Sequence, residues 1–402
     1  MTVLRLLPAA LVLLALAPCA AGEEFVVGEG GFDTIQSAID EALANEDLVD
    51  TVLVPPASYD ESVAIVLTNA DAQQKLTLRR KGNGGDVVIR GQGGAPALTI
   101  DGPDGVHLKN LVLDSGNDSD GVSALLVTGT TRNVDAKNVH GVPGDDVGVI
   151  VGPTAVGVRL DGSDFSGMLG IGFLIDGASH TLDDCRASAC GLNGIVLRPT
   201  SLNCLVEGAE AIAAGLPAGV DPGVISIDGT GHQLRKCVAG GAGAGGDGFH
   251  VEGTGHVLTK CDAAGNGRAG FNLNGAVVRL DKCEADENLF GVQGGGQGAV
   301  IDGGSFDQNS SHGVLLLQPG TLVRSISAEQ NVGNGVFVQS GVVGSRIQDC
   351  RFEANGAEGV FVLGSFTWVE GNVARDGDGL VDAGSSNSGR KNKVKGSGTN
   401  DC

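Results

Sequence analysis

Aromatic and basic residues are scarce in this sequence. Aromatic side chains make up 3 % of the 402 residues, with one Trp and one Tyr, so platforms for stacking sugars are few. Lys and Arg number 26 against 48 Asp and Glu, which gives a formal net charge of −22. Because a nucleic acid partner requires a basic surface, this balance argues against nucleic acid binding. It favours a soluble protein in an extracellular setting.

Long apolar runs are missing after residue 22. Before that point, Arg5 supplies a positive charge and residues 6–17 are apolar, followed by small residues. This order is typical of a signal peptide at residues 1–22, and its apolar run is too short to span a bilayer. A lipid anchor on Cys19 is less favoured, because Pro18 departs from the small residue usual there. We therefore expect an exported protein (secreted, cell-surface or periplasmic) without a transmembrane segment in the mature chain.

Glycine, by contrast, is abundant and periodic. Six of the 68 glycines open a phrase in which apolar and variable residues alternate, and their successive positions differ by 22, 21, 22, 22 and 24 residues. Alternation is the period of a β-strand, and a fixed period of 20–50 residues indicates a repeat architecture. The pattern predicts a parallel sheet wound into a solenoid, with one coil per repeat. The phrase glycines are Gly248, Gly270, Gly291, Gly313, Gly335 and Gly359.

A second recurring segment carries a cysteine. An apolar residue precedes the cysteine by three, Ala or Phe follows it by two, and the residue between is often charged, so the cysteine faces the core. Stacked thiols point in parallel, whereas a disulfide needs converging Cβ atoms, so we expect free thiols. The pairing of Cys190, Cys204 and Cys402 stays open. The cysteines in this slot are Cys185, Cys237, Cys261, Cys283 and Cys350.

Asparagines and histidines recur at fixed offsets as well. Five residues after the cysteine slot the chain has Asn266, Asn288, Asn309 and Asn355, whose amides would stack at a turn. Three histidines share another slot, two residues before the apolar anchor, and we expect them to stack as turn residues. No third ligand accompanies them, so they do not specify a metal site. These histidines are His180, His232 and His256.

Together these repeats resemble the right-handed parallel β-helix of the pectin lyase-like superfamily, over roughly residues 34–381. The resemblance implies an all-β, right-handed, single-stranded parallel β-helix, a solenoid with coils of about 22 residues and a short N-terminal capping helix. We expect four segments after this pattern. They are a signal peptide at 1–22, an N-terminal cap at 23–65 with a helix at 34–44 and a first strand, a parallel β-helix at 66–383, and a polar, basic tail or last coil at 384–402.

The catalytic motifs of that superfamily are missing. Of the polygalacturonase motifs only an Asp pair is present, at Asp145 and Asp146, and the pectin methylesterase and pectate lyase signatures are absent. Tyr59 and Glu61 resemble a Gly-x-Tyr-x-Glu pattern near the cap, with Ala57 in the place of glycine. Catalytic residues therefore stay unknown.

One acidic loop resembles a loose calcium site. Asp114, Asp118 and Asp120 place carboxylates at nearby positions, as calcium loops do. The spacing matches no standard loop, so no metal is assigned and no cofactor is expected beyond this possible Ca²⁺.

The outward face of the phrase strand offers a candidate site. Two residues past each glycine, the predicted outward row runs Ile150, Leu174, Val196, Ile225, His250, Asn272, Gln293, Leu315, Phe337, Phe361 and Val381. A second outward row, two residues further on, includes Glu252 and Asn274. The polar members form an island that is suited to hydroxyl recognition, namely His250, Glu252, Asn272, Asn274 and Gln293. Apolar residues beside it are candidates for self-association, namely Leu315, Leu317, Phe337, Phe361 and Leu363.

Two function classes fit this sequence. The first is an exported β-helix protein without a recognisable catalytic set, acting as a surface or extracellular binding or structural protein. The alternative is a polysaccharide-active enzyme (a lyase, glycoside hydrolase or epimerase) that uses the long face as a substrate groove, with His250 or Glu252 as acid or base. The candidate partners are a polysaccharide and, through the apolar strip, a second copy of the chain.

Overall fold

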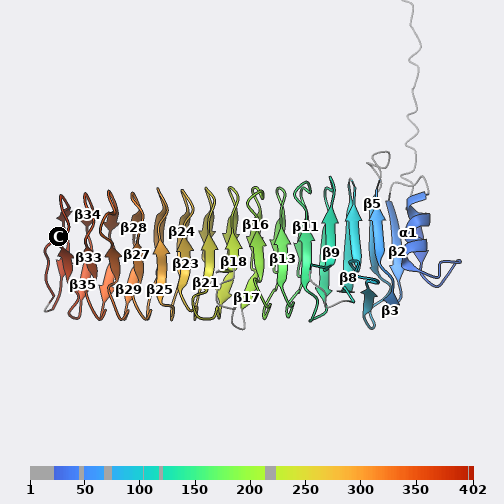
Figure 1. Cartoon of the computed structure of the whole chain (residues 1–402), viewed down its shortest axis with the longest axis horizontal. Coiled ribbons are helices and arrows are strands. Elements are labelled where there is room, and N and C mark those ends of the chain that lie inside the picture. Colours follow the sequence, from blue (N-terminus) through green and yellow to red (C-terminus); the bar gives the residue numbers. More distant parts are fainter. Residues whose placement is uncertain are drawn as a thin grey trace, which may run out of the picture.

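The computed structural model describes residues 22–44, 49–67, 75–102, 104–116, 121–212, 223–396 and 398–402. These residues form a right-handed parallel β-helix whose coils stack along one axis (Figure 1). A sheet of 14 strands takes one strand from each coil, and a sheet of 22 strands forms the remaining walls. The predicted all-β solenoid is thereby confirmed.

The strands of both sheets pair in parallel with the coils before and after them. The 14-stranded sheet contains β4 (Val63–Val66), β7 (Leu98–Asp101), β9 (Ser123–Thr128), β11 (Val147–Val151), β13 (Ile171–Ile175), β15 (Ile195–Leu197), β18 (Gly223–Ile227), β21 (Asp247–Val251), β23 (Ala269–Leu273), β25 (Phe290–Gly294), β27 (Val314–Leu316), β30 (Val336–Val338), β33 (Val360–Val362) and β36 (Leu380–Asp382). The 22-stranded sheet contains β1 (Glu24–Val26), β2 (Val49–Val54), β3 (Ala57–Asp60), β5 (Lys75–Arg80), β6 (Val87–Arg90), β8 (Val106–Asp114), β10 (Asp135–Gly141), β12 (Arg159–Asp161), β14 (Thr181–Asp183), β16 (Leu205–Glu207), β19 (Gln233–Arg235), β22 (Val257–Thr259), β24 (Arg279–Glu284), β26 (Val300–Ser305), β28 (Leu322–Arg324), β29 (Ser327–Glu329), β31 (Arg346–Gln348), β32 (Arg351–Glu353), β34 (Trp368–Glu370), β35 (Val373–Arg375), β37 (Ser388–Arg390) and β38 (Lys393–Val394). Two further strands, β17 (Glu210–Ile212) and β20 (Val238–Gly240), pair with each other.

A short helix, α1 (Ile35–Ala44), lies at the N-terminal end of the solenoid next to β2 (Figure 1). Thr34 caps it, because its Oγ1 accepts the backbone N–H of Ser37 at 3.0 Å. The carboxylate of Glu61 accepts the N–H groups of Ile35 at 2.8 Å and of Gln36 at 3.1 Å. Glu61 therefore serves the helix that covers the end of the core, which gives the Tyr59–Glu61 resemblance a structural role.

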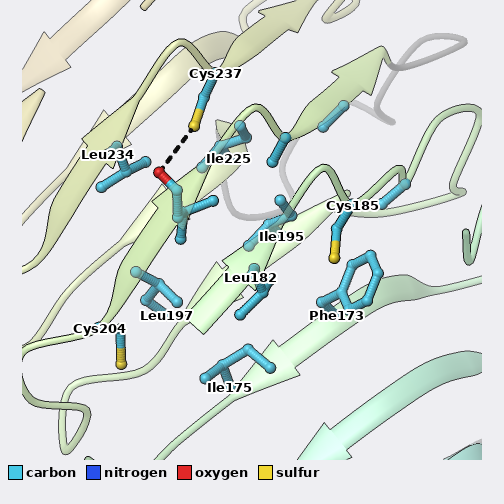
Figure 2. Close-up of a cluster of buried hydrophobic side chains, with 14 of the residues drawn as sticks. Phe173, Ile175, Leu182, Cys185, Ile195, Leu197, Cys204, Ile225, Leu234 and Cys237 are labelled. Carbon is cyan, nitrogen blue, oxygen red and sulfur yellow. Dashed lines mark hydrogen bonds between the residues drawn. The ribbon is translucent and has the colours of Figure 1, made fainter. Parts of the chain in front are cut away.

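Inside the solenoid, side chains at equivalent positions of successive coils stack on one another. Leu, Ile, Val and Phe side chains from successive coils lie above one another, and the cysteines fill the slot predicted for them (Figure 2). Cys237 Sγ lies 3.4 Å from the carbonyl oxygen of Val206 in the preceding coil, and Cys283 Sγ lies 3.4 Å from that of Leu258. The eight cysteines of the described chain are all free. The thiols thus donate to neighbouring coils instead of bridging them.

Asparagine and histidine columns line the turns. Asn288 accepts both the N–H and the side-chain amide of Asn266, at 2.9 and 3.0 Å, and the same pattern continues through Asn309, Asn331 and Asn355. His232 and His256 stack with ring centroids 5.0 Å apart. The predicted asparagine column is present, with Asn331 as an additional member. The histidine stack contains only His232 and His256, because the coil between His180 and His232 has Cys204 in that slot.

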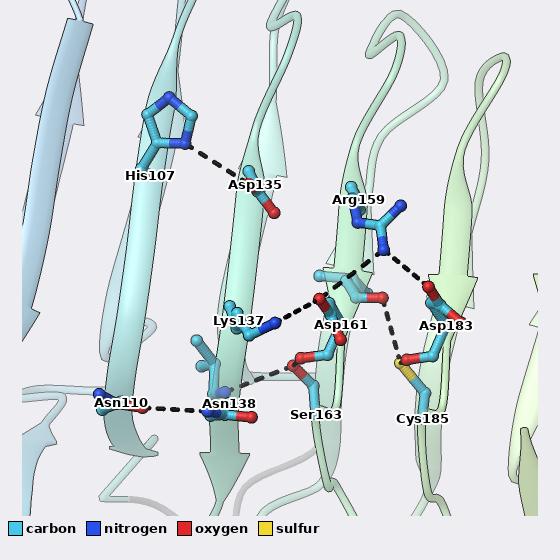
Figure 3. Close-up of polar contacts among 12 residues, drawn as sticks. His107, Asn110, Asp135, Lys137, Asn138, Arg159, Asp161, Ser163, Asp183 and Cys185 are labelled. Atoms are coloured by element: carbon cyan, nitrogen blue, oxygen red, sulfur yellow. Dashed lines mark hydrogen bonds and ion pairs between the residues drawn. The ribbon is translucent and has the colours of Figure 1, made fainter.

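The outer surface of the 22-stranded sheet is held by charge pairs between coils. Lys137 in β10 pairs with Asp161 in β12 at 2.9 Å, and Arg159 in β12 pairs with Asp183 in β14 at 2.6 Å (Figure 3). Because these groups are partly exposed, each pair adds little stability by itself. Their regular spacing follows from the register, which sets equivalent positions of successive coils side by side.

At the C-terminal end, strand pairing continues past residue 384. β37 pairs with β34, β38 pairs with β35, and Leu380 forms a bridge with Asn400. Cys402 is half-buried against the core. At the other end, the predicted signal peptide lies outside the described residues except for Gly22. No helix in the described part of the chain is long and apolar enough to cross a membrane.

Candidate functional site

The register sets the central polar residues in one row across three neighbouring strands. His250 in β21 pairs with Asn272 in β23, which pairs with Gln293 in β25. Neighbouring strands are about 4.8 Å apart, so these side chains are adjacent. Glu252 and Asn274 lie just past β21 and β23 and are exposed. The structure therefore brings the five predicted residues together on the outside of the 14-stranded sheet.

One neighbour in the predicted row is wrong. Ile225 is fully buried and pairs with the inward Phe249, whereas Ser226 pairs with His250 and continues the row. The cause is the register of β18, where Gly223 aligns with Asp247 and not with Gly248. A shift of one residue turns a side chain to the opposite face of a strand.

The side chains of this row are also less exposed to solvent than those on an outward strand face usually are. His250 is 7 % exposed and Asn272 is 5 % exposed. Gly223 allows this close packing, because a Cβ there would come within 2.6 Å of the His250 Cβ. The candidate site is thus a packed polar cluster with two exposed members, Glu252 and Asn274.

A fully buried carboxylate, which the sequence analysis did not single out, lies beneath the cluster. Asp247, the first residue of β21, accepts Arg268 Nε at 2.7 Å on Oδ1 and a second guanidinium nitrogen on Oδ2. Its Oδ1 also accepts the Ala269 N–H at 3.1 Å, and its Oδ2 accepts Asn272 Nδ2 at 2.9 Å. Burial by itself would raise the pKa of Asp247, but the hydrogen bonds from Arg268, His250 and Asn272 outweigh it and lower the pKa. Asp247 is therefore an anion at neutral pH.

His250 lies between two carboxylates. Its Nδ1 is 3.1 Å from Asp247 Oδ2, and its Nε2 is 3.2 Å from Glu252 Oε1. Burial by itself would lower the pKa of His250, but the hydrogen bonds to Asp247 and Glu252 outweigh it and raise the pKa. A carboxylate oxygen faces each ring nitrogen, which favours the imidazolium form with a proton on each. The Asn272 amide nitrogen also lies 3.2 Å from Nδ1, and it donates to Asp247 Oδ2. Such a group can donate a proton at Nε2, toward the exposed Glu252.

Gln293 adds an unused acceptor at the end of the row. Its Oε1 is buried and has no hydrogen-bond partner among the described residues. A buried acceptor without a partner is costly, so its position next to Asn272 is unfavourable unless a ligand or water donates to it.

Asp247 and Arg268 leave a faint signal in the sequence. Asp247 directly precedes Gly248, and Arg268 lies two residues before Gly270. The residue directly before the phrase glycine is apolar in some coils, as at Val147 and Ile171, and polar in others, as at Asn334. Alternation assigns residues to faces but does not show that a buried carboxylate contacts a residue three positions later. A carboxylate directly before a phrase glycine is the feature that could have identified Asp247.

The apolar residues beside the cluster are half-buried. Leu315, Phe337 and Phe361 continue the row of His250 in β27, β30 and β33. The rings of Phe337 and Phe361 stack with centroids 5.8 Å apart, and His312 lies 5.0 Å from Phe337. Leu317 and Leu363 are half-buried as well. Self-association through this strip stays a prediction.

The two acidic loops contain carboxylates with structural partners. Asp114 pairs with Arg90 at 2.8 Å, and Asp145 accepts the N–H and Oγ–H of Ser115 at 3.0 and 2.8 Å. Asp118 and Asp120 lie outside the described residues. Within the described chain, no group of three or more His, Cys, Asp or Glu side chains could hold a metal ion. Calcium binding at residues 114–120 stays a prediction from the sequence.

Comparison with known proteins identifies the fold. Residues 223–397 match the family model described as a right handed beta helix region, in agreement with the resemblance seen in the repeats. No curated protein matches the chain in sequence.

The solved structures that resemble this chain in fold include the following three. A mannuronan C-5 epimerase A-module from Azotobacter vinelandii has 17 % identity over 92 % of this chain and 92 % of that chain, with a TM-score of 0.40. An alginate lyase from Paenibacillus has 14 % identity over 66 % of this chain and 94 % of that chain, with a TM-score of 0.47. A DFA-IIIase from Arthrobacter chlorophenolicus has 12 % identity over 86 % of this chain and 93 % of that chain, with a TM-score of 0.48. Likeness at this level concerns the fold alone.

Proposed function

We propose that this parallel β-helix protein binds a saccharide on the outer face of its 14-stranded sheet, at His250, Glu252, Asn272, Asn274 and Gln293. The observation that carries the proposal is the buried carboxylate of Asp247, which orients His250 toward the exposed Glu252. A buried charge network is a weak source of stability, and two other coils fill the same slot with the apolar residues Val147 and Ile171. Perturbed, paired groups of this kind concentrate at functional sites.

The chemistry of the cluster suits hydroxyl groups. Amide side chains donate and accept, Glu252 accepts, and Gln293 Oε1 is an acceptor without a partner. The net charge of −22 disfavours a polyanion over most of the surface but does not oppose a neutral chain of hydroxyls. Successive coils repeat at about 4.8 Å, so the row can contact adjoining parts of one extended ligand. Export of the chain, predicted from residues 1–22, would bring this face to extracellular polysaccharide.

A second candidate function is catalysis at the same place. It is favoured by the arrangement of His250, which lies between the buried Asp247 and the exposed Glu252. An imidazolium held in this way could act as a general acid toward a glycosidic oxygen, with Glu252 beside it as the carboxylate partner. The protein would then be a polysaccharide-active enzyme. His250 would supply the acid, Glu252 would be its carboxylate partner, and no other catalytic group is assigned.

A paired variant tests both functions. We would screen the purified protein against neutral and acidic polysaccharides, measuring binding by calorimetry and turnover by reducing ends and by the absorbance of unsaturated products. The double variant His250→Ala with Glu252→Gln should lose binding by about tenfold or more, because two direct contacts are removed. Glu284→Gln, an exposed carboxylate on the 22-stranded sheet, is the matched control and should bind as the native protein does. Unchanged binding or turnover in the double variant would place the site elsewhere.

A further inference from the structure

A separate groove lies on the outside of the 22-stranded sheet, near the C-terminal end. It has a volume of about 260 Å³ and is lined by Arg346, Gln348, Trp368, Glu370 and Arg390. The register sets Arg346 of β31 beside Trp368 of β34, and sets Glu370 of β34 between Gln348 and Arg390. Trp368 is the single tryptophan of the chain, whose composition otherwise offers few aromatic platforms.

The tryptophan ring is held in a fixed orientation. Its Nε1–H donates to Glu370 Oε2 at 3.0 Å. Arg390 donates to the same carboxylate, with Nε 2.6 Å from Oε1 and Nη2 3.2 Å from Oε2, and its Cζ lies 5.2 Å from the centre of the Trp368 ring. These contacts satisfy the charges of Glu370 and Arg390 and support the ring from one side.

Arg346 differs from the arginine one coil earlier on this sheet. Arg324 pairs with Asp302, whereas the side chain of Arg346 makes no hydrogen bond or ion pair with any residue that the structure describes. Arg346 is exposed and borders the groove. Lys391, 3.8 Å from Glu370, adds a further positive charge nearby. In a chain with a net charge of −22, this is a locally cationic place with an unused guanidinium.

We propose that this groove binds a single acidic sugar ring. The apolar face of the ring would stack on Trp368, its anionic group would take the free guanidinium of Arg346, and Gln348 would hydrogen-bond its hydroxyls. A volume of about 260 Å³ is below the range of about 300–1,000 Å³ typical of sites for drug-sized ligands, which suits one ring. A neutral sugar would leave Arg346 unpaired, and the net charge of −22 on the whole chain disfavours a nucleic acid. The proposal is independent of the His250 site, which lies on the other sheet.

The single tryptophan makes the test direct, because the intrinsic fluorescence of the whole protein reports on this groove. We would titrate the full chain with three matched probes, trigalacturonate, neutral galactotriose and a sulfated galactotriose. The proposal expects a saturable change in Trp368 emission with an anionic probe and at least about tenfold weaker binding of the neutral one. Preference for the carboxylated or the sulfated probe identifies the anionic group that the site takes.

Variants then separate recognition from folding. Arg346→Gln should weaken binding of the anionic probe by about tenfold while leaving the melting temperature unchanged, because the Arg346 side chain makes no hydrogen bond or ion pair with a described residue. Arg235→Gln is the matched control, because Arg235 is an exposed arginine of β19 whose side chain donates to Gln233 Oε1 at 2.8 Å. Calorimetry with Trp368→Leu, which removes the reporter, should show loss of binding.

The proposal is overturned if no probe changes the emission, if all three bind equally, or if Arg346→Gln binds like the native chain. The double variant at His250 and Glu252 should bind these probes normally, so failure of one site is distinguishable from failure of the other.

Discussion

Asn355 donates its backbone N–H and its side-chain amide to the carboxylate of Asp378, across 2.8 Å and 2.6 Å. Asp378 is fully buried and ends the asparagine column, because it occupies the place that a further asparagine would take. Burial raises the pKa of Asp378 to about 6, against the lowering effect of the bonds from Asn355. The asparagine column therefore ends at Asp378, whose charged form is destabilised by burial.

Asp378→Asn should stabilise the protein at neutral pH. A carboxyl group whose pKa is raised in the folded chain stabilises the fold at low pH, and this contribution is lost as pH rises from about 4 to about 6. The amide has no such penalty and can accept both Asn355 donors, so we expect a gain of about 2–3 kcal/mol at neutral pH and almost none below pH 4. Melting temperatures at both pH values would measure it. Glu287→Gln removes one exposed negative charge from the surface as a control, and an equal gain there would contradict the explanation.

The buried histidines should make the fold sensitive to acid. Val158 N–H donates to His180 Nδ1 at 3.1 Å and Cys204 N–H donates to His232 Nδ1 at 3.0 Å, so both rings must be neutral on that side. Burial lowers the pKa of His180 and of His232 to about 4. The unfolded chain takes protons below pH 6.5 and the folded chain does not, so stability is full above pH 6.5 and falls toward pH 4. Each histidine can contribute up to about 3 kcal/mol to this loss.

The histidine effect can be separated from other acid effects by substitution. His232→Gln should flatten the decline of melting temperature between pH 6.5 and 4 relative to the native chain. His107→Gln, at a half-buried histidine whose Nδ1 lies 3.6 Å from Asp135 Oδ2, is the matched control. A native slope in the His232 variant would show that the decline arises from other groups.

The inward and outward faces of β23 can be compared in neighbouring residues. Phe271 is fully buried and stacks on Phe249 with centroids 4.9 Å apart, so Phe271→Asp places an unpaired charge in the core at a cost of several kcal/mol. We expect that variant to aggregate or unfold. Asn272 is not a suitable exposed control, because it donates to Asp247 and an aspartate there would face a carboxylate. Asn274→Asp, at an exposed position, should melt like the native chain, and equal damage from both variants would refute the assignment of faces.

The architecture could be predicted from the sequence because every coil repeats the same physical constraints. Asn266 and Asn288 occur five residues after a cysteine in each coil, and register alone then stacks their amides. The site was predicted less completely for the same reason. His250, Asn272 and Gln293 follow the repeat and were found, whereas Asp247 acts through contacts at a strand end that no period reveals.

The error at Ile225 has a specific cause in the chain. Residues 213–222 separate β17 from β18, and the glycine after them aligns one position away from the glycines of later coils. Counting outward residues from Gly223 therefore selects the buried Ile225 and misses Ser226. A regular sequence period predicts which side chains point inward only where the number of residues per coil stays the same.

The cysteine column predicts a particular pattern of reactivity. Cys237, Cys261 and Cys283 are free and buried, so the native protein should resist an alkylating reagent while the denatured, unreduced protein takes it at all three. Burial raises the pKa of Cys185 and of Cys350 to about 12, which keeps those thiols protonated and slow to react. Peptide mass spectra would identify the modified residues. A Cys237–Cys261 or Cys261–Cys283 bridge in these spectra would contradict the free-thiol column.

The protonation of His250 provides the most direct test of the candidate site before any ligand is known. Asp247 and Glu252 hold the pKa of His250 above its ordinary value of 6.5, so its ring should titrate above that of a free histidine in a nuclear magnetic resonance pH titration. Glu252→Gln removes the exposed carboxylate while leaving the buried Asp247 contact at 3.1 Å, so the pKa should fall. A raised folded pKa stabilises the protein below pH 6.5, and that contribution is lost as pH rises through the folded value. The same substitution at Glu284 should leave the titration unchanged. If His250 titrates at or below pH 6.5 in the native chain, the imidazolium does not persist at neutral pH and the proposed general-acid role fails. Saccharide binding by the neutral ring would then be tested separately.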